Sequence, residues 1–387
     1  MKWIITIPAI LLFALAGCGK DKQSTDELVT INVSKDYPEK ELILQDIMDV
    51  EYIALETTDE FITHGNVMDI GEKFIIVKNN TNDGNIFIFD RKTGKAIRKI
   101  NRLGQGVEEY PGIAGITLDE ENNELFVTHT GKISVYDLDG NFKRSLKRGD
   151  ELYFFHLYNF NQTSLITNNY WVTDKPAFTI ISKQDGTTKQ IQIPFKEKIS
   201  MAVNYSDKAK DIYYNVIPDN YNPIIPYFDC WVLVEQSSDT VYKYQSDHKM
   251  IPIIARTPSV QSMNPEVFLF LGILTNRYYF METVKKEYNF ETHEGFPTTD
   301  LLYDKQEKAI FEYIVYNNDY SEKRAVNMKS LPVDDKIASW QSIEASQLIE
   351  DYEKGKLKGR LKEIAASLDE ESNPVIMLIK HKKQTNP

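Results

Sequence analysis

A short two-strand unit recurs three times at a constant spacing in the first half of the chain. Each copy joins an alternating apolar strand to a second strand through a turn that contains a glycine, namely Gly94, Gly140 or Gly186. These glycines lie 46 residues apart. Glycine supplies the positive φ that a tight hairpin turn needs. A fixed period in this range, built from strands, is typical of a propeller blade, so the sequence predicts a β-propeller.

Five blades can be counted from this pattern. They cover residues 66–100, 113–146, about 154–193, 231–255 and 278–315. Two terminal strands, at 50–56 and 375–379, are left over. Placing both in one sheet, with the N-terminal strand at its edge, gives a sixth blade and removes two exposed sheet edges. We therefore predict an all-β fold, a six-bladed β-propeller of four-stranded blades that is closed by the N- and C-terminal strands.

The chain changes period near its C-terminal end. Over residues 342–368 the apolar residues recur at helical spacing, with an interruption around Gly355 and Gly359. Such a stripe predicts a C-terminal helix of about 342–368 that covers a sheet face or the rim of the ring. Because repeat folds of this length are commonly undivided, we predict that residues 30–387 form a single propeller domain.

The N-terminal residues predict an export signal. Lys2 precedes an apolar segment, residues 4–15, that is too short to span a bilayer. It ends in Leu-Ala-Gly-Cys at residues 15–18, which resembles the lipobox of bacterial lipoproteins. That resemblance implies a signal peptide at 1–17 and lipid attachment at Cys18, with 18–29 as a flexible tether. Several acyl chains anchor a protein stably without a membrane-spanning helix.

Charge and cysteine content exclude some classes of partner. The chain carries 57 acidic and 45 basic residues, a formal net charge of −12. This balance argues against nucleic acid as a partner, since such binding needs a basic face. The membrane is then expected as a partner only through the N-terminal anchor. Cys230, the one other cysteine, precedes an apolar strand and is expected to be a buried thiol.

Several segments together resemble one protein family. They are the lipobox, the strand at 50–58, the loop at 102–110 after the first blade, and Asn-Pro-Val-Ile-Met at 373–377. Together they look like the bacterial six-bladed β-propeller lipoproteins, which are related to NHL-repeat and TolB-like propellers. The resemblance covers the mature chain and implies a lipid-anchored protein of the cell envelope, at the outer membrane. It implies no particular chemistry, because function is carried by sites rather than by folds.

An aromatic stretch between the third and fourth blades is the candidate binding surface. Residues 205–231 are interrupted by three prolines and carry the five candidate ligand-binding tyrosines, which are Tyr205, Tyr213, Tyr214, Tyr221 and Tyr227. Tyrosine offers a flat apolar face and a polar tip, which suits a glycan, a peptide or a protein partner. The alternative is that these rings only pack the segment against its neighbours.

No catalytic pattern is recognisable in the sequence. The six histidines show no metal-ligand spacing, and no Gly-x-Ser-x-Gly elbow is present. We therefore predict a non-catalytic binding or scaffold protein without a metal or cofactor. The alternative is a channel-centred enzyme, either a metal-dependent hydrolase or a lactonase-like enzyme, for which His129 and His156 could approach the central channel. A structural subunit of an envelope complex is a third possibility.

Overall fold

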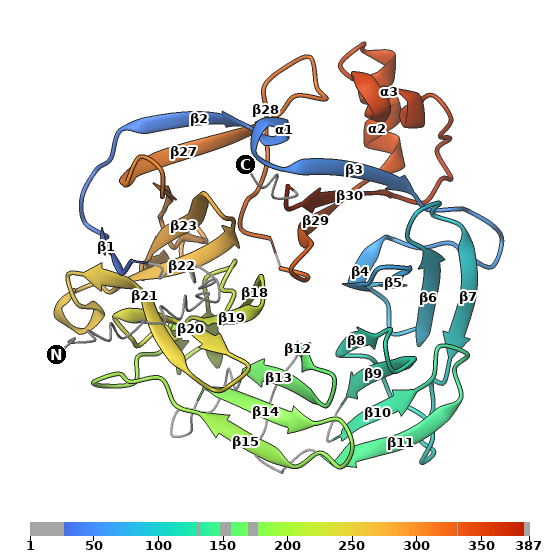
Figure 1. The fold of residues 1–387 in the computed structure, drawn as a ribbon, viewed down its shortest axis with the longest axis horizontal. Coiled ribbons are helices and arrows are strands. Elements are labelled where there is room, and N and C mark those ends of the chain that lie inside the picture. The colour runs from blue at the N-terminus through green and yellow to red at the C-terminus, as the bar shows by residue number, and fades with distance from the viewer. Residues whose placement is uncertain (1–26, 130–131, 148–155, 169–176, 331, 383–387) are drawn as a thin grey trace, which may run out of the picture.

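The computed structural model describes residues 27–129, 132–147, 156–168, 177–330 and 332–382, and its strands form a ring of six β-sheets (Figure 1). This arrangement confirms the six-bladed β-propeller predicted from the sequence. The first strand of each of the first three blades lies toward the centre of the ring, and the last strand lies outside (Figure 1). Cys18 and the expected signal peptide lie outside the described residues.

The first three blades each have four antiparallel strands in chain order. Their strands are β4 (Asn66–Ile70), β5 (Phe74–Lys78), β6 (Asn85–Asp90) and β7 (Ala96–Asn101); β8 (Gly115–Asp119), β9 (Glu124–His129), β10 (Lys132–Tyr136) and β11 (Phe142–Lys147); and β12 (Leu157–Asn161), β13 (Ser164–Asn168), β14 (Phe178–Ser182) and β15 (Thr188–Ile191). The repeating glycines Gly94, Gly140 and Gly186 adopt φ values of 70°, 84° and 77°. Each therefore takes the left-handed turn position that the sequence predicted.

The next two blades are extended by strands from the N-terminal segment. Blade four contains β18 (Ile224–Tyr227), β19 (Cys230–Leu233), β20 (Thr240–Gln245) and β21 (Met250–Thr257), followed by the short helix η1 (Val260–Ser262); blade five contains β22 (Val267–Leu274), β23 (Tyr278–Lys285), β26 (Thr298–Asp304), β27 (Ala309–Asn317) and the short β28 (Arg324–Ala325). Strand β1 (Val29–Asn32) pairs in parallel with β21, and β2 (Glu39–Ile43) pairs in parallel with β27. The outer edges of both blades are thus covered.

Blade six joins the two ends of the chain, as predicted. Strand β3 (Asp49–Ala54) pairs antiparallel with β30 (Val375–Lys380), which pairs in turn with β29 (Ile337–Ile343). The prediction of four-stranded blades is wrong here, because this sheet has three strands. Its chain between β29 and β30 forms helices instead of a further strand.

The predicted C-terminal helix is two helices. They are α2 (Ala345–Glu353) and α3 (Gly359–Ala365), separated at Gly355, which has a φ of 66°. Residues 342–343, which the helical pattern included, end strand β29 instead. Leu348, Leu361 and Ile364 pack with Val375 in the apolar core between blades five and six, together with α1 (Leu44–Ile47). No helix in the described ranges is long and apolar enough to cross a membrane.

Apolar side chains fill each space between neighbouring blades. Strand β30 shows how one strand serves two of these spaces. Ile376 and Leu378 point into the core shared with blade one, while Val375, Met377 and Ile379 point into the core shared with blade five. Alternate residues of a strand face opposite sides of its sheet, so a fully buried strand must be apolar throughout.

Polar contacts also join neighbouring blades. Glu120, which follows β8, accepts hydrogen bonds from the backbone N–H groups of Glu72, Lys73 and Phe74 at 2.9–3.0 Å. These donors lie in and just after the turn between β4 and β5 of blade one. Because hydrogen bonds to an ionised carboxylate are stronger than neutral ones, Glu120 fixes that turn against blade two.

A buried carboxylate holds β2 to blade five. Asp304 of β26 is fully buried, and its side chain contacts Lys40 of β2 at 3.0 Å and Arg277 at 2.8 Å. Burial raises the pKa of Asp304, but hydrogen bonds from Arg277, Lys40 and two backbone N–H groups outweigh burial and hold that pKa well below its ordinary value. The turn that follows lacks glycine, and Lys308 takes the left-handed conformation with a φ of 50°.

We predict that Asp304→Asn lowers the free energy of unfolding by about 3 kcal/mol at neutral pH. This is the low end of the range for breaking a buried ion pair, because Lys40 and Arg277 are partly exposed. A carboxyl group whose pKa is lower in the folded state than in the unfolded state gives its full stabilisation of the fold above the unfolded-state pKa of about 4. This stabilisation is lost as the pH falls from there toward the folded-state pKa. The difference between wild type and variant should therefore shrink below pH of about 4. Urea unfolding between pH 3 and 7 measures it, with the exposed Asp36→Asn as control.

Candidate functional site

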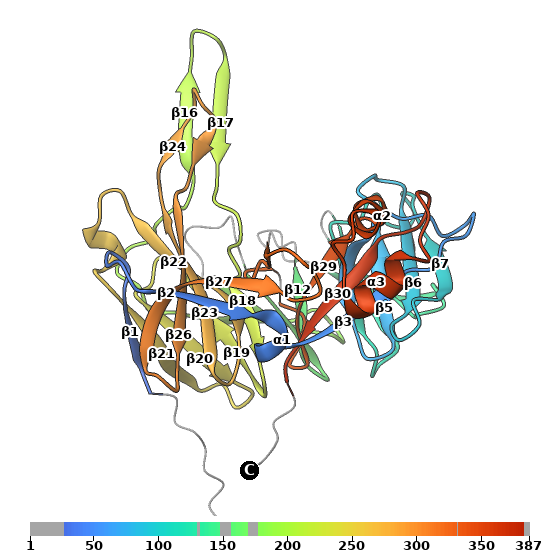
Figure 2. The ribbon, with the colours of Figure 1, turned by 90° about the horizontal axis from the view of Figure 1, so that it is seen from above.

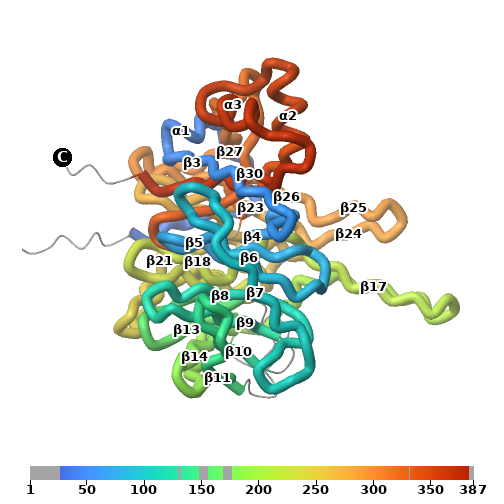
Figure 3. Tube along the Cα trace, turned by 90° about the vertical axis from the view of Figure 1, so that its right-hand side faces the viewer, coloured from blue at the N-terminus to red at the C-terminus, as the bar shows by residue number. Residues whose placement is uncertain are grey.

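Two hairpins project from the same face of the ring. The first is formed by β16 (Val203–Asp207) and β17 (Ile212–Val216), which lie between blades three and four in the sequence. The second is formed by β24 (Tyr288–Asn289) and β25 (Glu294–Gly295), and it extends the connection between β23 and β26 of blade five. Figures 2 and 3 show both hairpins extending beyond the blades in the same direction. They are the most protruding part of the described chain in these views.

Three aromatic rings hold the two hairpins together. Tyr205 and Tyr214 are cross-strand partners in the first hairpin. Phe290, at the tip of the second hairpin, stacks on both of them, with ring centroids 5.2 Å from Tyr205 and 6.0 Å from Tyr214. Tyr288 packs against Phe290 at 4.8 Å. Stacking of this kind stabilises a contact beyond the area that it buries. Tyr205, Tyr214 and Phe290 therefore attach the first hairpin to blade five, and we call this contact the Phe290 clasp.

Tyr213 lies on the opposite face of the first hairpin, because neighbouring residues of a strand point to opposite sides. Its side chain is 66% exposed. The Tyr213 hydroxyl donates a hydrogen bond to Oδ1 of Asn204 at 3.0 Å, and the amide of Asn215 donates to the same oxygen at 2.7 Å. As a result, the ring of Tyr213 is held in position, faces solvent and has the amide side chains of Asn204 and Asn215 beside it.

The structure does not bring all five predicted tyrosines together. Tyr205, Tyr213 and Tyr214 share the projecting hairpin. Tyr221 is half-buried, and its hydroxyl donates to the carbonyl oxygen of Val234 at 2.6 Å. Tyr227 is buried in β18, the first strand of blade four. These last two tyrosines therefore pack within the ring, as the alternative interpretation of the stretch expected.

Sequence reasoning missed the second hairpin and its contribution. Phe290 lies 76 residues beyond Tyr214 in the chain. No local pattern indicates that the two meet, because their contact depends on how blades three, four and five are arranged. The aromatic residues Tyr288, Phe290 and Phe296 are close together in the sequence and are the signal that could have drawn attention to this segment.

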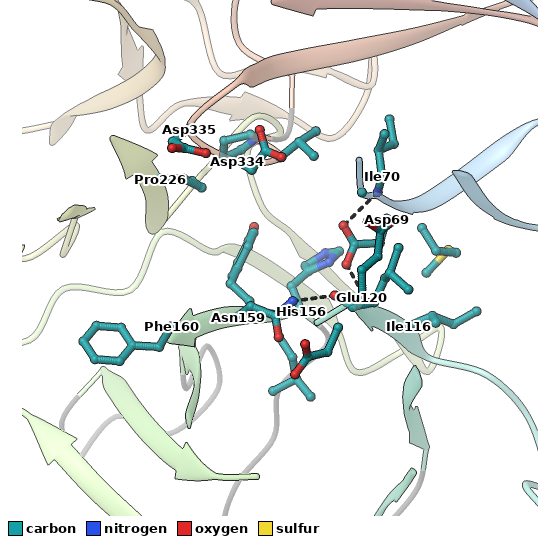
Figure 4. A pocket seen from close by; sticks show the side chains of 18 of the residues that line it. Asp69, Ile70, Ile116, Glu120, His156, Asn159, Phe160, Pro226, Asp334 and Asp335 are labelled. Atoms are coloured by element: carbon teal, nitrogen blue, oxygen red, sulfur yellow. Dashed lines mark hydrogen bonds between the residues drawn. The ribbon is translucent and has the colours of Figure 1, made fainter. Parts of the chain in front are cut away.

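A central cavity of about 1200 Å³ is the second candidate site (Figure 4). The first strands of blades one to three form part of its wall, together with residues 332–336 and the turn between β18 and β19. Its lining combines carboxylates with aromatic rings and includes Asp69, Glu120, His156, Tyr158, Trp231 and Asp334. Such a cavity is large enough for a small molecule.

Asp69 connects the blades around this cavity. Its carboxylate accepts hydrogen bonds from the backbone N–H groups of Ile70 at 2.8 Å and Leu118 at 2.7 Å. The carbonyl oxygen of Leu118 accepts a hydrogen bond from the side chain of Asn159 on β12. One carboxylate and one amide therefore link the inner strands of blades one, two and three, and this gives Asp69 a structural role.

The environment of Asp69 also changes its proton affinity. Burial raises the pKa of Asp69 to about 7, although the two backbone hydrogen bonds act to lower it. The negative charges of nearby Asp334 and Glu120 also contribute to this increase in the pKa. Burial likewise raises the pKa of Asp334. The cavity wall therefore contains a carboxyl group that exchanges its proton near neutral pH.

The two histidines considered for a channel-centred enzyme do not converge. His129 is buried on β9 beside Ser134, 3.0 Å from its hydroxyl, and burial lowers the pKa of His129 to about 4. His156 lines the cavity, and burial lowers its pKa too. Among the residues that the structure describes, no three His, Cys, Asp or Glu side chains are grouped so that they could hold a metal ion. Cys230 is buried in β19, as expected.

Comparison with known proteins identifies the family. Residues 19–338 match the family DUF5128, described as 6-bladed beta-propeller. The chain belongs to this family. The match confirms the resemblance to six-bladed propellers seen in the sequence, and it spans the ring from the N-terminal segment to the start of blade six.

Two solved structures resemble this chain at low sequence identity, and the first has the same fold. A Bacteroides fragilis protein described as exported is 13% identical, with a TM-score of 0.57 over 92% of this chain and 100% of the other. A member of the DUF4221 family from Bacteroides vulgatus is 11% identical, with a TM-score of 0.47 over 88% and 100% of the two chains. No curated protein matches the sequence.

We predict that Asp69 titrates near pH 7, far above the ordinary value of about 4. Between these two values the folded chain keeps a proton that the unfolded chain has released, so the contribution of Asp69 to the free energy of unfolding falls as the pH rises through this window and then levels off. Carbon-detected NMR of aspartate-labelled protein should show one carboxyl that titrates near 7. That signal should be missing from Asp69→Asn, and an unchanged titration in the variant would contradict the assignment.

We also predict that Phe290→Ala separates the two hairpins. Removal of the ring takes away the stacking partner of both Tyr205 and Tyr214. Amide hydrogen exchange in residues 203–216 should then become faster, while the blades remain unaffected. Phe195→Ala, which removes an exposed phenylalanine away from this contact, is the matched control. Equal exchange in the two variants would show that Phe290 does not hold the hairpin.

Proposed function

We propose that the protein is a lipid-anchored binding or scaffold protein of the cell envelope, held at the outer membrane through Cys18. In this proposal the paired hairpins are the surface that meets a glycan, peptide or protein partner. The role is non-catalytic and needs no cofactor. The observation that carries the proposal is the projection of exposed aromatic side chains on a two-hairpin support.

The direction of the hairpins agrees with an N-terminal anchor. Strand β1 begins on the face of the ring opposite to the one from which the hairpins project (Figure 2). A tether that leads from β1 to a lipid at Cys18 would place the opposite face, and with it the hairpins, away from the membrane. The binding surface would then face the surrounding compartment, where a partner can reach it.

The exposed aromatic residues support a contact surface. Single exposed apolar side chains are common on proteins and need no explanation. Here Tyr205, Tyr213 and Tyr214 are 41%, 66% and 42% exposed on one hairpin. Tyrosine is enriched at binding surfaces because it offers a large rigid area with a polar end. The related Bacteroides fragilis structure, described as exported, supports an envelope location.

We predict that Cys18→Ala releases the protein from the membrane. Loss of the acylated thiol would remove the only anchor proposed for the chain, because acyl chains supply the membrane affinity. Detergent phase partitioning and metabolic labelling with an alkyne fatty acid measure this. Cys230→Ala, which removes the buried thiol, should leave both unchanged. Fatty-acid labelling that persists in Cys18→Ala would contradict the anchor.

The binding role is tested by photocrosslinking in intact cells. A benzophenone amino acid replaces Tyr213 on the hairpin or, as control, Tyr352, which is 37% exposed on α2. We expect discrete adducts from position 213 and none from position 352. Equal labelling at both positions, or none at either, would contradict a binding surface on the hairpins.

A further inference from the structure

We infer that the outward face of the β16–β17 hairpin binds a neutral saccharide chain, with the ring of Tyr213 as the stacking platform. This inference rests on the proposed function and names its class of ligand. The face consists of the alternate residues that point away from the Phe290 clasp, which are Asn204, Ser206, Tyr213 and Asn215. All four side chains are exposed.

The register of the hairpin leaves the Tyr213 ring open. Tyr213 lies directly opposite Ser206, whereas Tyr205 lies opposite Tyr214. A serine side chain is too small to cover a neighbouring ring, and Tyr213 is 66% exposed. Tyr205 and Tyr214, which stack on each other and on Phe290, are 41% and 42% exposed. The π face of an aromatic ring is electron-rich. The C–H face of a pyranose is apolar and weakly positive, so it matches this surface.

The groups beside the ring match sugar hydroxyls. Oδ1 of Asn204 accepts from both Tyr213 and Asn215, and this orients both amide side chains. The hydrogen-bonding capacity that remains includes the NH₂ group of Asn204 and the oxygen of Asn215. A donor and an acceptor thus stand next to one aromatic ring. Hydroxyl groups on adjacent ring carbons of a sugar can donate to one and accept from the other.

Charge favours a neutral ligand. None of Asn204, Ser206, Tyr213 and Asn215 carries a charge, although the whole chain has a formal net charge of −12. The turn at the tip of the hairpin carries Asp207, Lys208, Lys210 and Asp211, whose formal charges cancel, and Lys210 pairs with Asp207 at 3.5 Å. An acidic polysaccharide would find no cation among the four residues of the face and would be repelled by the net charge of the molecule. A basic peptide would find no carboxylate on it. The uncharged face therefore selects against both.

The opposite face of the hairpin keeps the site in place. A two-stranded hairpin is marginally stable by itself in water. Here Tyr205 and Tyr214 stack on Phe290 and attach the hairpin to blade five. The rigid support lowers the entropy that would be lost when a ligand orders the site.

The test uses the full mature chain in detergent on an array of neutral gluco-, manno-, galacto- and xylo-oligosaccharides, uronic-acid oligosaccharides and unstructured peptides. Binding of the oligosaccharides is then measured by saturation-transfer NMR, which detects weak ligands. We expect neutral oligosaccharides to bind. Tyr213→Ala should weaken this binding by about tenfold or more, as loss of a central aromatic contact does. Tyr213→Phe, which keeps the ring, should stay within about threefold of wild type.

Tyr352→Ala is the matched control, because it removes an exposed tyrosine on α2 and should leave binding unchanged. Equal thermal unfolding of Tyr213→Ala and wild type shows that the fold is intact. The inference is overturned by binding only to uronic acids or only to peptides, by a blank array, or by neutral binding that survives Tyr213→Ala. If one of these results is obtained but crosslinking at position 213 still captures a partner, only the saccharide inference fails. If crosslinking captures no partner either, the proposed function fails as well.

Discussion

The pairing of β3 with β30 is the contact on which the ring depends, because it joins residues from opposite ends of the chain. Ala54 lies opposite Val375 and Asp49 opposite Lys380, so the register is continuous over six pairs. The side chains of β30 then face blade one on one side and blade five on the other. Without this strand both neighbouring cores would be open to water, and the apolar burial that holds the blades together would be incomplete. The same strand thus closes the ring and completes the two cores beside it.

The N-terminal segment does more than close the ring. Its strands β1, β2 and β3 lie in turn on the outer edges of blades four, five and six. The first two pair in parallel with their neighbours, so the segment runs around the ring and covers three edges that could otherwise pair with another chain. Lys40 of β2 adds a charged contact with the buried Asp304.

The two candidate sites draw on different parts of the ring. The cavity is built from inner strands whose polar groups already serve the structure, as Asp69 and Glu120 show by binding backbone N–H groups of neighbouring blades. In the hairpins, Tyr205 and Tyr214 serve the contact with Phe290, whereas Tyr213 points away from it and remains exposed. An exposed aromatic side chain outside such a structural contact is available for binding.

The sequence by itself determined the repeat, since Gly94, Gly140 and Gly186 mark turns whose positive φ is a local requirement of the backbone. It also determined that the terminal strands form one sheet, because the five blades counted along the chain leave these two strands over. Only the tertiary structure decided that blade six has three strands, that Tyr227 belongs to the ring, and that Phe290 stacks on Tyr205. The raised pKa of Asp69 likewise depends on groups from blades one, two and six. Such contacts join residues far apart in the chain, and no local pattern encodes which distant side chains the closed ring brings together.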